Sequence, residues 1–265
     1  MKIARFYLDD INNISYGKLV NNRIYELQND PIIGDKSYEL SGEKFSSSEV
    51  KFLPPVTPPN IIAIGLNYSD HAEEAGLEIP DQPLIFAKAT SSIIGPQDDI
   101  ILPKKAPNQV DYEAELGVVV SKECKNVSPE EVDEYILGYT CVNDVTARDC
   151  QQRDGQWVRA KSFDTFCPVG PIIENELDPD NCNIVCRVNN EIRQKSNTAN
   201  MIFSVEEIIS YLSHNMTLLP GTLILTGTPA GVGLSYDTDK YLKAEDEVKV
   251  EISGIGVLEN QVKKC

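Results

Sequence analysis

Short apolar segments separated by polar turns run through most of the chain, and this pattern predicts a protein built mainly from β-strands. Two helices are expected where a serine is followed three residues later by a glutamate, the capping-box pattern. One begins at Ser128 and the other runs from Ser204 to about Leu212. Beyond the N-terminal region, strands are expected at 61–64, 116–120, 137–143, 183–188, 222–226 and 247–252.

A proline-rich segment at 53–60 divides the chain, because proline continues neither a central strand nor a helix. The residues before it contain three short predicted strands, at 3–8, 15–20 and 23–27, which are too few to enclose much of a core. We therefore expect a small N-terminal β-rich domain at 1–55 and a larger domain at 60–265.

The composition is that of an ordinary soluble globular protein, with 41% hydrophobic and 25% charged residues. No apolar run is long enough to span a bilayer, and the N-terminus lacks the core of a signal peptide, so a cytoplasmic location is expected. The net charge of −17 disfavours nucleic acid and anionic membrane as partners. Seven cysteines without a CxxC spacing indicate neither a disulfide framework nor a zinc ribbon.

Two glutamates two residues apart, Glu113 and Glu115, lie in the strand-like run 110–120. Alternate residues of a strand share a face, so their carboxylates are expected side by side, where their repulsion favours a bound cation. An isolated pair of this kind is more often a solvated strand face. Asp144, at the end of the strand predicted at 137–143, would add a third carboxylate. Oxygen ligands alone suit Mg²⁺, Mn²⁺ or Ca²⁺ rather than zinc.

A histidine suited to proton transfer lies in the segment 65–76, where Glu74 follows His71 by three residues. In a helical turn these side chains share a face, so Glu74 would orient and charge-stabilise His71. A helix cap or surface role is the plainer interpretation of a lone histidine. The second histidine, His214, has no comparable setting and is expected to be structural.

Five ordered motifs together resemble the fumarylacetoacetate hydrolase superfamily: GLNYSDHAEE, VDYEAELGVVV, NDVTARD, AKSFDTFCPVGP and LTGTPAGVG, over residues 60 to about 258. The resemblance implies an α+β, mainly β fold with a mixed β-roll, flanking helices and a small N-terminal domain, assembled as a homodimer. Family members with an additional aspartate ligand carry it upstream of the histidine, whereas Ile64 stands seven residues before His71 here. This departure points to the branch with three carboxylates.

The resemblance also assigns roles to matching positions. It implies a metal triad of Glu113, Glu115 and Asp144, an acid/base dyad of His71 and Glu74, and a lysine, Lys161, that meets the substrate. It further implies that the substrate's carboxylate or keto oxygens are contacted by Arg148, Gln151 and Thr228.

The implied function is a Mg²⁺- or Mn²⁺-dependent enzyme, with Ca²⁺ as a further candidate, that acts on small 2-oxo acids through a metal-stabilised enolate. Hydrolysis of the C–C bond of acylpyruvate-type 2,4-dioxo acids is the leading expectation. Isomerisation or decarboxylation of substrates like 2-hydroxyhepta-2,4-diene-1,7-dioate, and decarboxylation or tautomerisation of oxaloacetate, are the alternatives. A catalytically silent metal-binding dimer is the alternative of another class. The distal half of the substrate is expected to lie near residues 75–83 and 193–203.

Overall fold

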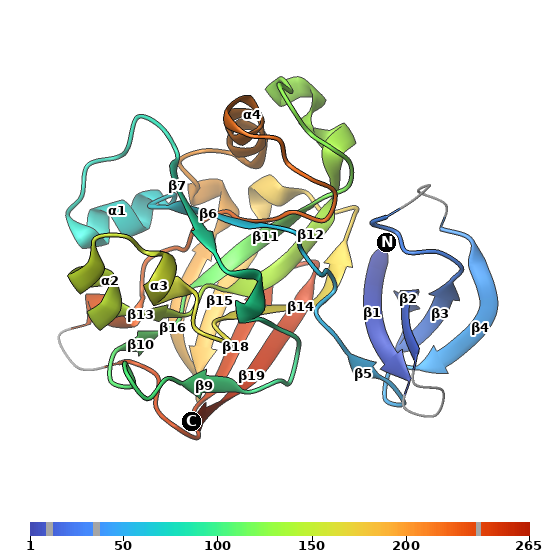
Figure 1. Ribbon diagram of the computed structural model, residues 1–265, viewed down its shortest axis with the longest axis horizontal. Coiled ribbons are helices and arrows are strands. Elements are labelled where there is room, and N and C mark those ends of the chain that lie inside the picture. The colour runs from blue at the N-terminus through green and yellow to red at the C-terminus, as the bar shows by residue number, and fades with distance from the viewer. Residues whose placement is uncertain (9–12, 34–37, 237–239) are drawn as a thin grey trace.

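The computed structural model describes residues 1–8, 13–33, 38–236 and 240–265, and it shows the expected mainly β protein with few helices (Figure 1). A small group of N-terminal strands lies beside a larger body that contains the other elements (Figure 1). The strands of the small group are β1 (Lys2–Leu8), β2 (Asn13–Val20), β3 (Arg23–Leu27), β4 (Leu40–Ser46) and β5 (Lys51–Phe52).

One long sheet joins the two parts, because β1 pairs with β14 at Ile3 and Ile173. Its order is β4-β3-β2-β1-β14-β12-β11-β17-β6-β7, with β5 and β8 at its margins. Pairs are antiparallel except β17 with β6 and β14 with β8. The strands of the larger body in this sheet are β6 (Ile61–Gly65), β7 (Leu84–Lys88), β8 (Ile93–Ile94), β11 (Ala114–Val120), β12 (Ile136–Asn143), β14 (Cys167–Glu174) and β17 (Leu223–Leu225).

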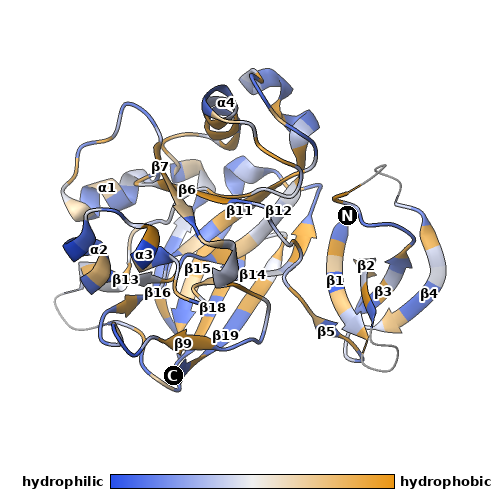
Figure 2. Cartoon of the chain, viewed as in Figure 1, coloured by the Kyte–Doolittle hydropathy of each residue, from blue (hydrophilic) through white to orange (hydrophobic). Residues whose placement is uncertain are grey.

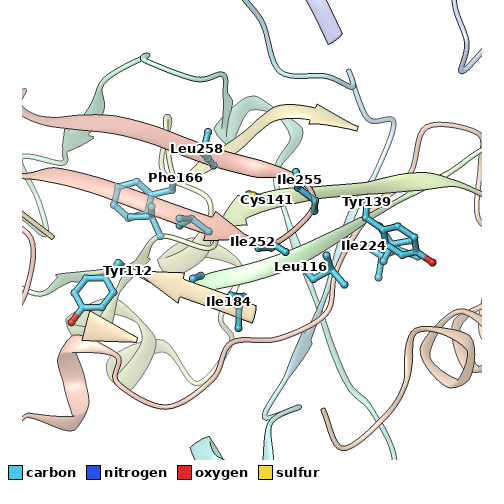
Figure 3. Close-up of a cluster of buried hydrophobic side chains, with 14 of the residues drawn as sticks. Tyr112, Leu116, Tyr139, Cys141, Phe166, Ile184, Ile224, Ile252, Ile255 and Leu258 are labelled. Carbon is cyan, nitrogen blue, oxygen red and sulfur yellow. The ribbon is translucent and has the colours of Figure 1, made fainter. Parts of the chain in front are cut away.

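A second sheet, in the order β16-β15-β18-β19-β9, packs against the first, and the main core lies between them. Strands β11 and β12 contact β18, so the apolar side chains of both sheets meet, as Figure 3 shows for Leu116, Ile184 and Ile252. The strands of this sheet are β9 (Ile100–Leu102), β15 (Asn183–Val188), β16 (Glu191–Asn197), β18 (Glu247–Ile252) and β19 (Gly256–Lys264). Strands β10 (Val110–Asp111) and β13 (Thr146–Ala147) form a separate antiparallel pair.

The helices are short and flank the sheets (Figure 1). Figure 2 shows long hydrophobic stretches along the central strands, whereas α2 is mainly hydrophilic. The α-helices are α1 (Ser69–Ala75), α2 (Arg148–Asp154), α3 (Val158–Lys161) and α4 (Val205–Asn215); the 3₁₀ helices are η2 (Thr90–Ser92), η3 (Pro129–Tyr135), η4 (Pro179–Asn181), η5 (Thr198–Asn200) and η6 (Gly233–Ser235). No helix in the described part of the chain is long and apolar enough to cross a membrane.

Both capping boxes are present, but the elements they start differ from the prediction in detail. The segment after Ser128 is a 3₁₀ helix, and α4 extends to Asn215, three residues beyond Leu212. The expected strands are found within one or two residues at each end. Strands β4, β7, β9, β14, β16 and β19 are among those not predicted, and β14 and β16 show why. The first contains Pro168 and Pro171, and the second, Glu191–Asn197, is polar and partly exposed, so neither has the pattern of a buried strand.

One structural expectation is wrong. Glu113 is not in a strand, because the run 110–120 breaks at Tyr112 and Glu113 between β10 and β11. The main-chain N–H of Glu113 donates instead to the side-chain oxygen of Asn143, at 3.0 Å. The closeness of the two glutamates therefore comes from this break and its side-chain contact, and not from alternation along one strand.

Candidate active site

The three predicted carboxylates lie together because of the pairing of β11 with β12. These strands are antiparallel, with Ala114 opposite Asn143, so the beginning of β11 lies beside the end of β12. The amide of Asp144 donates to the carbonyl of Glu113 at 2.8 Å. Glu113, Glu115 and Asp144 each offer an oxygen within 4.8 Å of the others, and all three are buried.

Two buried lysines contact this acidic cluster. The ammonium of Lys161, at the end of α3, lies 2.7 Å from Glu113 and 2.6 Å from Asp144. The ammonium of Lys88, at the end of β7, lies 2.5 Å from the other oxygen of Asp144. Burial opposes the charge of Lys161, but Asp144 and Glu113 raise its pKa, so it stays an ammonium. Lys88 was not predicted as a site residue. Its position as a lysine at the end of the apolar run Leu84–Lys88 could have indicated it.

Arg148 begins α2 and connects the cluster to a fourth buried carboxylate. Its Nε donates to Asp111 at 2.8 Å, its Nη2 lies 2.8 Å from Glu113, and its Nη1 donates to Gln151, one helical turn later, at 2.9 Å. Asp111 is fully buried and was also missed by the sequence analysis, since a single aspartate in a strand gives no signal by itself.

The two glutamates differ in their electrostatic setting. Burial opposes ionisation of Glu113, yet Lys161 and Arg148 lower its pKa to about 2. For Glu115, burial and the neighbouring Asp144 and Glu113 raise the pKa well above its ordinary value. Its carboxylate accepts a hydrogen bond from the amide of Gly227 at 2.7 Å, and no lysine or arginine of the described residues pairs with it. Gly227 has φ of 100°, and a Cβ there would lie 2.8 Å from the Cβ of Asn67, so glycine suits this approach.

This donor set fits a divalent cation that prefers oxygen. Three buried carboxylates converge, no cysteine or histidine belongs to the group, and Glu115 lacks a positively charged partner among the described residues. With Asp111, four carboxylates face Lys88, Lys161 and Arg148, so the cluster has more negative than positive groups. A bound Mg²⁺ or Mn²⁺ held by Glu113, Glu115 and Asp144 would offset this excess.

His71 and Glu74 lie on α1 as expected, but they are not hydrogen-bonded to each other. The Nδ1 of His71 is 3.5 Å from a Glu74 oxygen, and it is buried with no hydrogen-bond partner among the described residues. The Glu74 carboxylate accepts from the amide of Gly231, at 3.0 and 3.1 Å, and from the hydroxyl of Ser235, at 2.6 Å. Glu74 therefore connects α1 to the glycine-rich turn.

Most of the predicted residues line one small cavity of about 70 Å³. Phe86 and Trp157 form part of its wall, and Thr228 lies on it while donating to the carbonyl of Ala114 at 2.9 Å. Glu74 and Asp144 contact residues of the wall without lining it themselves. The predicted residues on the wall are His71, Glu113, Glu115, Arg148, Gln151, Lys161 and Thr228.

Comparison with known proteins identifies relatives over nearly the whole chain. The family model of the fumarylacetoacetate (FAA) hydrolase C-terminal domain matches residues 60–263, and a model described as Rv2993c-like, N-terminal, matches residues 1–55. An uncharacterized protein of Methanocaldococcus jannaschii is 52% identical, covering 86% of this chain and 98% of that protein. The mitochondrial oxaloacetate tautomerase Fahd2a of Rattus norvegicus is 47% identical, covering 81% of this chain and 70% of that protein.

A solved structure has the same fold over both full chains. The 5-carboxymethyl-2-hydroxymuconate delta-isomerase from Mycobacterium smegmatis matches with a TM-score of 0.90 and 36% identity, covering 100% of each chain. The similar proteins thus include enzymes named as a tautomerase and as an isomerase, alongside a family named for a hydrolase.

Proposed function

The chain belongs to the fumarylacetoacetate hydrolase family. From this premise we propose that it is a Mg²⁺- or Mn²⁺-dependent enzyme that interconverts the keto and enol forms of a small 2-oxo acid. Oxaloacetate is the first candidate substrate. The observation that carries the proposal is the position of His71, which faces the same small cavity as Glu113, Glu115 and Arg148. Proton transfer at the carbon next to a keto group needs one such base, with positive charge near the keto oxygen.

Each residue of the cavity has a task in this reaction. Arg148 and Gln151 would bind the substrate carboxylate, and Lys161 would stabilise negative charge on the keto oxygen. His71 would take the proton from the adjacent carbon and return one to the oxygen or the carbon. A divalent cation at the three carboxylates would supply a Lewis acid for the same oxygen. The small free volume favours a short substrate unless α1 moves away.

Hydrolysis of a C–C bond is the second candidate, and the position of Glu74 favours it. Glu74 is 3.5 Å from Nδ1 of His71, so a small movement would complete the dyad that activates water. Against this, the Glu74 carboxylate is already engaged by Gly231 and Ser235. Tautomerisation needs no activated water and is compatible with the geometry as it stands.

The test measures the rate of oxaloacetate tautomerisation from the absorbance of the enol. The uncatalysed rate is subtracted. Metal-stripped enzyme should be inactive, and Mg²⁺ or Mn²⁺ should restore turnover. His71→Asn should lower kcat by roughly 10² or more, the usual effect of a positioned proton-transfer group. His214→Asn is the matched control, because His214 binds the carbonyl of Ser210 at 2.8 Å on α4, which does not line the cavity.

The same assay separates the alternatives. Acetylpyruvate and 2-hydroxyhepta-2,4-diene-1,7-dioate are tested alongside oxaloacetate, with products identified by NMR. A faster reaction with acetylpyruvate would make hydrolysis the main activity, and a faster reaction with the dienedioate would make it isomerisation or decarboxylation. No turnover of any of them by metal-loaded enzyme would favour the catalytically silent dimer.

A further inference from the structure

Asp111 is the most heavily hydrogen-bonded carboxylate near the cavity, although it neither lines the cavity nor belongs to the three-carboxylate cluster. It is fully buried at the end of β10. One oxygen accepts from the amides of Tyr112 and Gly233, at 2.9 and 2.7 Å. The other accepts from the amide of Leu234 at 3.1 Å and from Nε of Arg148 at 2.8 Å. Its carboxylate is therefore fixed by three main-chain amides before it meets Arg148.

The contact with Arg148 divides one edge of the guanidinium between two carboxylates. Nε and Nη2 form the edge that an arginine commonly uses to bind both oxygens of one carboxylate. Here Nε binds Asp111, and only Nη2 reaches Glu113, at 2.8 Å. Without Asp111, both donors would be free to bind Glu113 in the two-bond geometry. Arg148 would then compete with a metal ion for that glutamate.

We propose that Asp111 is a positioning residue that holds Arg148 by Nε, limits its contact with Glu113 to one hydrogen bond, and so keeps Glu113 available as a metal ligand. The inference rests on the proposed function, because it takes Glu113 as a ligand of a divalent cation. It extends that function, because a residue outside the cavity would then control the affinity for the metal. Asp111 contacts neither the substrate nor the metal in this account.

The chain offers a way to move Asp111 without changing any charge. A Cβ at Gly233 would lie 2.6 Å from Oδ1 of Asp111, so Gly233→Ala must displace the carboxylate or the turn that holds it. Asp111→Asn, in contrast, removes the charge, and its amide NH₂ cannot accept the hydrogen bonds of the main-chain amides. If position matters and not charge alone, both substitutions should have the same direction of effect.

The experiment measures Mn²⁺ affinity without substrate, from the electron paramagnetic resonance signal of free Mn²⁺. The variants are Asp111→Asn, Gly233→Ala, Arg148→Gln and the combination of Asp111→Asn with Arg148→Gln. Asp154→Asn is the matched control, because Asp154 forms an ion pair with Arg159 at the surface and contacts no residue of the acidic cluster. Circular dichroism verifies that each variant is folded.

Asp111→Asn and Gly233→Ala should weaken Mn²⁺ binding by about ten-fold or more, the usual scale for residues that orient metal ligands. Arg148→Gln alone should bind Mn²⁺ at least as tightly as the wild type, and the double variant should recover to within about three-fold of it. A merely structural role of Asp111 would give no such recovery. Asp154→Asn should match the wild type.

Three results would overturn the inference: folded Asp111→Asn with wild-type affinity, a double variant as weak as Asp111→Asn, or Gly233→Ala with wild-type affinity. If Asp111→Asn does not fold, the Mn²⁺ affinity of Gly233→Ala is compared with that of Gly233→Ala combined with Arg148→Gln. Recovery of affinity in the combined variant supports the inference, and no recovery overturns it. A wild-type protein that does not bind Mn²⁺ would instead refute the proposed function. The two failures are therefore distinguishable.

Discussion

Glu74 has two kinds of neighbour, one suited to a chemical role and the other to a structural role. One side faces His71 at 3.5 Å, and the other is bound by Gly231 and Ser235. If Glu74 takes part in activating water, Glu74→Ala should lower acylpyruvate hydrolysis by roughly 10² or more while affecting oxaloacetate tautomerisation much less. Rates with both substrates, measured on metal-loaded enzyme, provide the comparison.

Two neighbours supply the controls for this substitution. Glu73→Ala removes an exposed carboxylate from the same helix and should change neither rate. Ser235→Ala removes one hydrogen bond of the connection to the turn and leaves Glu74 in place, so it reports the effect of loosening α1. Equal losses of both activities in Glu74→Ala, reproduced by Ser235→Ala, would mean that Glu74 serves closure rather than water activation.

At the scale of elements, α1 acts as a cover attached to the cavity by a few polar contacts. Asp70 accepts from the hydroxyl of Ser196 at 2.5 Å, and Glu74 binds the glycine-rich turn. The helix ends at Ala75 and is capped by Gly76, whose φ is 63°, and the exposed Leu77 and Ile79 follow. Few apolar contacts therefore hold the segment after the helix, and because the cavity measures only about 70 Å³, we expect this segment to move when a larger substrate enters.

We therefore expect residues 71–83 to exchange amide hydrogens rapidly in the free protein and to become protected with Mg²⁺ and oxalate, an enolate mimic. Hydrogen exchange followed by mass spectrometry measures this. Helix α4, whose inner face is buried, should show the same protection in both states and serves as the internal reference. Equal protection of 71–83 with and without ligand would contradict a closing role.

At the scale of the whole molecule, the net charge of −17 opposes association of two copies. The family resemblance implies a homodimer, and the interface of such a dimer would have to overcome this repulsion by apolar or specific polar contacts. Light scattering after size-exclusion chromatography should give twice the chain mass, with a tighter dimer at high salt because screening weakens the repulsion. A monomer at both low and high salt would contradict the homodimer.

The local elements and their chemistry could be predicted from the sequence because they depend on neighbouring residues. Apolar runs predicted β6, β11 and β12, and serine with glutamate predicted the starts of η3 and α4. The acidic triad was predictable too, since Glu113 and Glu115 are two residues apart in sequence and Asp144 directly follows a recognisable strand. The polar strand β16 and the proline-containing β14 were not, because sheet pairing overrides their weak local preference.

Only the tertiary structure determined which charges meet. Lys88 and Lys161 are 73 residues apart in the chain, yet both contact Asp144, because β7 and α3 pack beside the end of β12. Asp111 reaches Arg148 across 37 residues, and Glu74 reaches Gly231 across 157. Contacts over such separations depend on sheet order and loop closure, which no local pattern encodes. The sequence alone determined which chemical groups are available, and the fold decided which of these side chains contact one another.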